Sequence, residues 1–352
     1  SDMENSITKL INVKGQLMDL SYPQVTFRTA GPSAMSIQVG LEDDLSAMLL
    51  NNDVDPEVPE GTEYYLPAGS SYRVTPFSLM KGFRLAGSRD GVKPVVVLEG
   101  SWSIAEGSYL SSLEFDNIEF RHEANNNYFM NTSKAYTIEN VSFVNCDFIS
   151  LRRGFWRHQS ANAKYIMNLE MEGCRFEGCG WQTSAYGTFN LQSFDKDNGV
   201  SYDQVDRAIF RNCTFSNDND GTNGYGWGNL FYAPYMDKPI ELEYKNVTIY
   251  NYSRNQRLIN IESAVGSKLV MQGILLASPC GDLYAIGANT TTTFSDNYTT
   301  ADYALGGSKM NATDLEITAD KLFADPVNGD LTIKDTSSPI VSSRAGDTRW
   351  LP

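Results

Sequence analysis

The sequence predicts an all-β fold, a right-handed parallel β-helix (a solenoid) with a short N-terminal capping helix. Three observations predict it. A short apolar phrase recurs along the chain, each copy has Asn or Gly at its centre, and the residues on both sides alternate between apolar and polar. Recurrence at intervals of about 20 to 50 residues is typical of solenoids and other repeat arrays. An elongated fold of this kind allows the 352 residues to form one large domain.

The recurring phrase is clearest in "LEFDNIEF" (113–120), "FVNCDF" (143–148), "LEMEGCRF" (169–176), "FRNCTF" (210–215) and "LEYKNVTI" (242–249). Asn and Gly are the residues that most readily adopt a left-handed backbone conformation. We therefore predict a left-handed corner at each central residue. The column consists of Asn117, Asn145, Gly173, Asn212, Asn246 and Gly273, with Gly87 as an earlier member.

Apolar residues lie two and four positions before each centre, and one and three positions after it. Each flank therefore alternates as a half-buried strand does, and the phase slips at the corner so that both strands face one interior. The Asn side chains of the column, Asn117, Asn145, Asn212 and Asn246, are expected to stack in an interior structural ladder. Cys146, Cys174 and Cys213 fall in one inward column and are expected to be buried free thiols, with a disulfide between neighbouring coils left open.

A β-propeller is the main alternative, because its blades also repeat at about 40 residues. Each blade would need four strands and tight hairpins, whereas each unit here has one corner phrase followed by a variable polar stretch. The β-helix fits better.

The chain is expected to comprise an N-terminal edge segment with a capping helix (1–54) and a β-helix (55–352). The stretch 41–52 places Leu41, Leu45, Met48 and Leu49 on one helical face. Three segments exceed a minimal coil and are predicted to be long loops that cluster in space, where binding residues usually lie. They are 151–167, 180–207 and 216–240. The tail after about residue 323 is expected to form a last β coil.

The net charge of −15, with 43 acidic against 28 basic residues, disfavours nucleic acid and anionic membranes as partners. No apolar run is long enough to span a membrane. Five cysteines and two histidines without a clustered pattern disfavour a structural zinc site. We expect a monomer. The opening "SDMENSITK" is not a signal peptide, so any secretion signal is not visible in this chain.

The coil phrases, the N-terminal pattern from "EGTEYYLPAGSSYRV" to "FRLAGSRDGVKPVVVLEG", and the terminal "GDLTIKDTSSPIV" resemble the pectate-lyase-like superfamily of right-handed β-helices over about residues 55–345. The N-terminal part is similar to chondroitinase-B-like and alginate-lyase-like enzymes. The whole resembles secreted or surface β-helix proteins of polysaccharide-degrading gut bacteria. The resemblance implies an extracytoplasmic protein that acts on or binds a polysaccharide.

In the resembling lyases a Lys or Arg acts as the base, and a second Arg or a calcium ion neutralises the sugar carboxylate. The densest basic cluster here supplies Arg153, Arg157 and Lys164 as candidate catalytic residues, with Arg152, His158 and the stacking ring of Trp156 as candidate substrate contacts. The family's catalytic motif is not matched residue by residue. Pairing of these cations with surface carboxylates is the competing interpretation.

Aromatic side chains in the predicted loops suit the apolar faces of sugar rings. The candidates are Trp181, Tyr186, Tyr225, Trp227, Phe231, Tyr232 and Tyr235. "NDNDGTNG" (217–224) offers Asp218 and Asp220 as candidate calcium ligands, although its spacing is not that of an EF-hand. An ordinary turn is the competing interpretation.

Three hypotheses follow. The leading one is polysaccharide binding on the loop-bearing side, the second is a polysaccharide lyase that cleaves a uronic-acid polymer by β-elimination, and the third is a structural or adhesive surface protein with a protein partner. No complete catalytic set can be assigned, and calcium is the one cofactor that the sequence suggests. A glycosidase pair of carboxylates is not indicated, because the spacing of Asp195, Asp197, Asp203 and Asp206 matches no such motif.

Overall fold

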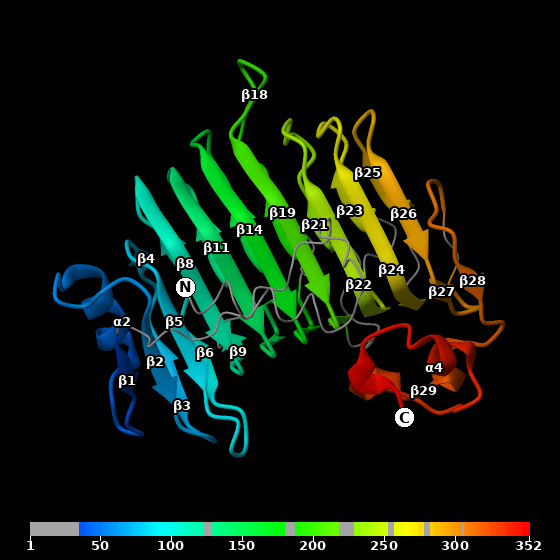
Figure 1. The fold of residues 1–352 in the computed structure, drawn as a ribbon, viewed down its shortest axis with the longest axis horizontal. Helices are drawn as coiled ribbons and strands as arrows, with labels where there is room; N and C mark the ends of the chain where they lie inside the picture. The colour runs from blue at the N-terminus through cyan, green and yellow to red at the C-terminus, as the bar shows by residue number, and fades with distance from the viewer. Residues whose placement is uncertain are drawn as a thin grey trace, which may run out of the picture. The chain divides into compact units, whose positions relative to one another are not determined.

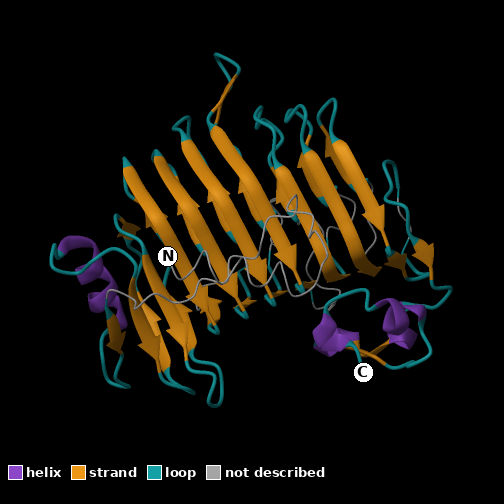
Figure 2. Ribbon diagram, viewed as in Figure 1, coloured by secondary structure: helices purple, strands orange, loops and turns teal. Residues whose placement is uncertain are grey.

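The computed structural model describes residues 35–122, 128–151, 153–179, 187–217, 229–252, 257–277, 282–303 and 306–352. The chain divides into two units, residues 1–33 and Ala34–Pro352, and the described residues belong to the second. Strands dominate this unit and helices are short (Figure 2). The fold is all-β with a large parallel sheet, which confirms the predicted class at that level.

Long strands from successive repeats pair in parallel and in register (Figure 1). Inward-facing residues of equivalent position therefore stack, as Phe115 does on Phe143, with ring centroids 4.8 Å apart. The long strands are β8 (Ser108–Asp116), β11 (Tyr136–Val144), β14 (Lys164–Glu172), β19 (Asp203–Arg211), β22 (Glu241–Tyr250) and β24 (Lys268–Ala277).

Short strands continue the sheet after each corner. Their central phenylalanines stack in a second inward column, with 4.8 Å between the ring centroids of Phe148 and Phe176 and again between Phe176 and Phe215. These strands are β9 (Glu119–His122), β12 (Asp147–Ile149), β15 (Arg175–Glu177) and β20 (Thr214–Ser216); the second halves of β22 and β24 take the same place.

The predicted corners are left-handed. All six residues of the column from Asn117 to Gly273 have φ between 48° and 65°. Asn145 Nδ2 donates to Asn117 Oδ1 at 2.7 Å, so one rung of the Asn ladder forms. Gly173 interrupts it, and Asn212 and Asn246 instead donate to Glu172 Oε1 and to the backbone oxygen of Arg344. Only Asn117 is buried, which corrects the expectation of an interior ladder.

Gly87 is not a left-handed corner, although it aligns with Asn117 as expected. A β-carbon at Gly87 would lie 2.3 Å from the Asn117 backbone oxygen and 2.4 Å from Pro94 Cγ. Close approach of the backbone, and not a positive φ, requires glycine there.

A second parallel sheet runs through segments that the sequence predicted as long loops. In β16 and β23 an outward Asn lies between two apolar residues, and in β10 and β13 the second inward position holds Thr132 and His158. Each strand pairs in parallel with the equivalent strand of the next repeat. The strands are β10 (Met130–Thr132), β13 (Trp156–His158), β16 (Phe189–Leu191), β21 (Phe231–Tyr232), β23 (Ile259–Ile261) and β25 (Tyr284–Ile286).

The predicted N-terminal helix is α2 (Leu45–Val54), and its Leu45 and Leu49 are buried in the main core. Asp44 caps it by accepting from the Ala47 backbone N–H, a typical N-cap interaction. Leu41 lies before the helix and is exposed, contrary to prediction. The neighbouring strands are β1 (Ser36–Gln38), β2 (Thr62–Leu66), β3 (Ser71–Val74), β4 (Ser78–Leu79), β5 (Phe83–Gly87), β6 (Val95–Leu98) and β7 (Ser103–Ile104).

The C-terminal tail does not add another parallel coil. Instead, β29 and β30 pair antiparallel around a turn at η1, and the tail packs in a separate apolar cluster against Tyr250, Leu275 and Ala277. The tail elements are α3 (Ala319–Leu322), β29 (Phe323–Asp325), η1 (Pro326–Asn328), β30 (Asp330–Ile333), α4 (Pro339–Ser343) and η2 (Thr348–Trp350). The remaining strands are β17 (Phe194–Asp195), β18 (Val200–Ser201), β26 (Thr291–Ser295), β27 (Tyr298–Thr299) and β28 (Thr313–Asp314).

The predicted cysteine column is confirmed. Cys146, Cys174 and Cys213 are buried free thiols, as is Cys179. Cys280 lies outside the described residues. Burial raises the pKa values of the Cys146 and Cys174 thiols well above that of an ordinary cysteine. Both thiols therefore stay protonated and act as small apolar core groups.

The corners make a stability prediction. Asn145→Ala should lower the free energy of unfolding by about 2 to 3 kcal/mol. The left-handed conformation costs alanine about 1 to 2 kcal/mol, and loss of the hydrogen bond to Asn117 costs about 1 kcal/mol more. Asn145→Gly keeps the backbone conformation and should lose only about 1 kcal/mol. Urea unfolding followed by circular dichroism measures both. Equal losses for the two variants would contradict the role of the left-handed corner.

Candidate functional site

The outward face of the second sheet carries one row of polar side chains, one from each of the strands β10, β13, β16, β21 and β23. Register pairs Asn131 with Arg157, Arg157 with Asn190, Asn190 with Tyr232, and Tyr232 with Asn260. Their neighbours within each strand, such as Met130, Trp156 and Phe189, point into the core. Adjacent strands lie about 4.8 Å apart, so these five residues form a continuous row that crosses five strands. We call it the polar row.

Arg157, predicted as a catalytic residue, and Tyr232, predicted as a substrate contact, both lie in this row. The Arg157 guanidinium sits 5.5 Å from the centroid of the Tyr128 ring, and Arg157 is half-buried. Arg153 lies in the turn before β13. Its Nε is buried and has no hydrogen-bond partner within the described residues. No helix brings Arg153 and Arg157 onto one face.

Two amides of the row, Asn190 and Asn260, are buried, and Asn131 Oδ1 has no hydrogen-bond partner within the described residues. Asn190 is 1% exposed although it faces away from the core; its Oδ1 accepts from Gln192 at 2.6 Å, and its Nδ2 has no partner within the described residues. Asn260 accepts from the backbone N–H of Glu262. Glu262 and Asp282 both pair with Arg257, which places mixed charges at this end of the row.

Of the four tyrosines predicted as sugar contacts, Tyr232 and Tyr235 lie within the described residues, and they differ in environment. Tyr232 is half-buried in the row, and burial, followed by the proximity of Tyr235 and Glu262, raises the pKa of its phenol. Tyr235 lies after β21 and its ring stacks on Phe194 with centroids 4.2 Å apart, so one face of that ring is already covered. Phe231 points into the core and is buried.

Trp156, His158 and Lys164 are not surface groups, which corrects their prediction as substrate contacts or catalytic residues. Each is at most 1% exposed. Trp156 and His158 occupy the inward positions of β13, and Lys164 opens β14 with its ammonium group donating to Ser160 O, Asn162 O and Ser193 Oγ. Burial lowers the pKa of Lys164 to about 8, but its three donors are all used.

These residues belong to a buried hydrogen-bond chain that joins both sheets. Trp156 Nε1 donates to the Tyr136 hydroxyl at 3.2 Å, Tyr136 lies 2.5 Å from His158 Nε2, and His158 Nδ1 lies 2.6 Å from Asp203 Oδ1. The Ser193 backbone N–H donates to Asp203 Oδ2. With His158 neutral and protonated on Nδ1, every donor points along the chain toward an ionised Asp203.

The pKa directions agree with that arrangement. Burial lowers the pKa of His158 below its ordinary value. The pKa of the Asp203 carboxyl is also lowered. Burial opposes this, but the electrostatic interaction and hydrogen bond with His158 prevail, followed by the Ser193 N–H and the cationic Lys164. A closed chain of this kind stabilises the fold, because each buried polar group has a partner.

Seven predicted site residues lie outside the described residues: Arg152, Trp181, Tyr186, Asp218, Asp220, Tyr225 and Trp227. Within the described ranges, no group of three or more His, Cys, Asp or Glu side chains could hold a metal ion. Over the same ranges, no helix is both long and apolar enough to cross a membrane.

The sequence contains a signal for the second sheet that the corner analysis missed. An apolar pair precedes each outward residue of the polar row in "FMNT", "FWRH", "LFYA" and "LINI", and "TFNL" follows the same pattern with Thr188. Aligning these phrases would have placed Asn131, Asn190 and Asn260 beside Arg157 and Tyr232.

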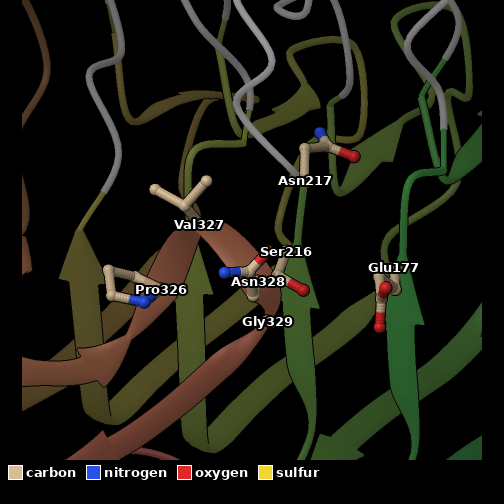
Figure 3. A pocket seen from close by; sticks show the side chains of 7 residues that line it. All are labelled: Glu177, Ser216, Asn217, Pro326, Val327, Asn328 and Gly329. Carbon is tan, nitrogen blue, oxygen red and sulfur yellow. The ribbon is translucent and has the colours of Figure 1, made fainter.

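A separate cavity of about 210 Å³ lies between strand ends and the C-terminal turn (Figure 3). Glu177, Ser216 and Asn217 line one side, and Pro326 to Gly329 line the other. None of the polar-row residues lines it, and its Glu177 carboxylate already lies 3.6 Å from Arg175.

No family model matches the chain, and no curated protein matches it in sequence. A proposal for the function therefore rests on the polar row.

The buried hydrogen-bond chain should make the free energy of unfolding depend on pH. The unfolded chain takes up a proton on His158 as the pH falls through about 6.5, whereas the buried imidazole resists it, so the free energy of unfolding should fall in acid. His158→Gln removes this group and should flatten the dependence between pH 7 and 5 by up to about 1.4 kcal/mol per pH unit. Urea unfolding at each pH measures it; His122→Gln should flatten the dependence separately, because burial also lowers the pKa of His122. Parallel curves for wild type and His158→Gln would refute the assignment.

Proposed function

We propose that the described unit is a right-handed parallel β-helix of the pectate-lyase-like kind. The support is threefold: successive repeats pair in parallel and in register, each repeat supplies a strand to both sheets, and left-handed corners recur at the same position. These are the features that a coil with a constant interior requires.

We further propose that the protein binds a polysaccharide, and that the polar row is the binding surface. The observation that carries the proposal is the register itself, which places Asn131, Arg157, Asn190, Tyr232 and Asn260 side by side across five strands. A linear polymer laid across the strands would meet a new hydrogen-bonding side chain at intervals of about 4.8 Å.

The chemistry of the row suits sugars. Amides both donate and accept, as sugar hydroxyl groups do, and an aromatic ring packs on the apolar face of a pyranose. Asn190 Nδ2 and Arg153 Nε are buried donors without partners in the described ranges, and such groups favour a ligand that offers acceptors.

Uronate lyase activity is the second candidate, and the environment of Lys164 weighs against it. A lyase base must reach the proton next to the sugar carboxylate, whereas Lys164 and His158 are enclosed and hydrogen-bonded. Arg157 and Arg153 remain as groups that could hold a carboxylate. A calcium requirement would have to come from Asp218 and Asp220, outside the described residues. An adhesive role toward a protein is the third candidate.

We propose that the protein acts outside the cytoplasm, at the cell surface or in the extracellular space, because the polysaccharides considered as its ligands are extracellular. We expect it to act as a monomer, since the row needs no second copy to be complete.

The test is a panel of neutral and uronic-acid polysaccharides, with and without calcium, titrated calorimetrically and followed at the ultraviolet absorbance of unsaturated uronate ends. Tyr232→Ala and Arg157→Ala should each weaken binding at least about tenfold, which corresponds to about 1.4 kcal/mol. Tyr65→Ala, a half-buried outward tyrosine of β2, is the matched control and should bind as wild type does.

Each outcome separates the hypotheses. A rise in absorbance with wild type, lost in Arg157→Ala, would replace simple binding by lyase activity. Undiminished binding in both row variants would remove the polar row as the site, and absence of binding to every polymer would favour the adhesive role.

A further inference from the structure

The outward face of the first sheet carries a second surface, unrelated to the polar row. Thr137 pairs in register with Tyr109 on one side and with Tyr165 on the other. The two tyrosines therefore stand about 10 Å apart, two strand spacings, with a small residue between them. Strands β8, β11, β14 and β19, which carry this surface, lie side by side in Figure 1.

Hydrogen bonds hold both rings in place. The Tyr109 hydroxyl donates to Glu139 of the next strand, and the Tyr165 hydroxyl donates to Asp206 Oδ2 of its next strand at 2.5 Å. Each tyrosine side chain thus extends toward the strand of the following repeat. Tyr109 is nevertheless 55% exposed, so its ring remains open to a partner.

The hydrogen bonds to Glu139 and Asp206 raise the pKa of both phenols, that of Tyr165 to about 12. The phenols therefore stay neutral and keep donating at any physiological pH. A hydroxyl that donates to a carboxylate also makes its ring more electron-rich, which strengthens attraction to a cation over the ring face.

The carboxylates around the rings have no cation of their own. Glu60 accepts from the Ser111 backbone N–H beside Tyr109, and Glu139 and Asp206 bind the phenols. None of the three forms an ion pair within the described residues. On β19, the Arg207 guanidinium already binds Glu170 at 2.6 Å and Asn168 at 2.9 Å.

We propose that this tyrosine pair, Tyr109 and Tyr165 with their carboxylates, is a docking surface for an extended basic segment of a protein partner. Two lysine or arginine side chains would each lie over one ring and pair with its carboxylate. Charge decides the class of partner, because rings and carboxylates both attract cations and repel acidic chains. The surface is independent of polysaccharide binding.

The test uses a fluorescent peptide of alternating Lys and Ser residues, titrated against the whole protein by anisotropy. The negative controls are the same peptide with acetylated lysines and its Glu counterpart. Wild type should bind the Lys peptide alone, and more weakly as salt rises. Tyr109→Ala and Tyr165→Ala leave the charge of the protein unchanged and should each weaken binding at least about fivefold. Tyr65→Ala is the matched control and should not.

A charge pair separates this surface from the general acidity of the protein. Glu139→Gln should weaken binding at least about fivefold, whereas Glu42→Gln removes the same charge at an exposed site outside the patch and should change it less than twofold. Equal effects of these two, full binding by the tyrosine variants, or no binding by wild type would each overturn the proposal. Circular dichroism confirms that each variant is folded, and Tyr109→Phe provides a milder variant should an alanine variant fail to fold.

Discussion

The structure depends on the left-handed backbone at each corner. A strand that turns without a change of phase would point its apolar residues outward after the bend. The Asn or Gly at the corner resets the alternation, so Phe143 and Phe148 both enter one interior on either side of Asn145. Once every repeat bends at the same position, parallel pairing in register follows, and like side chains stack on like.

The same register organises the outer faces. Because each repeat presents its outward residues at matching positions, single side chains that are far apart in sequence become rows. Asn131, Arg157, Asn190, Tyr232 and Asn260 form one row on the second sheet. Tyr109, Thr137 and Tyr165 form another on the first. Both proposed binding surfaces are rows of this kind, and both proposals depend on the register.

The interior is not uniformly apolar, and the exceptions tie the sheets together. The chain from Trp156 through Tyr136 and His158 to Asp203 links β11, β13 and β19, and Lys164 closes it through Ser193. Tyr, His, Asp and Lys side chains can act in catalysis when they line an open cleft, but here they are buried and link the two sheets. Their exposures are 3% or less, and hydrogen bonds within the chain hold them together.

The sequence by itself determined the strand class, the left-handed corners, the inward cysteine column and the N-terminal helix, because each depends on local conformational preference or short-range alternation. It also drew attention to Arg157 and Tyr232. Only the tertiary structure showed that Trp156, His158 and Lys164 are enclosed. It also showed that close contact with Asn117 requires glycine at position 87, and that the segments expected to be loops contain a second sheet. Those outcomes depend on which repeat lies beside which, and three-residue strands carry too little alternation to reveal that pairing.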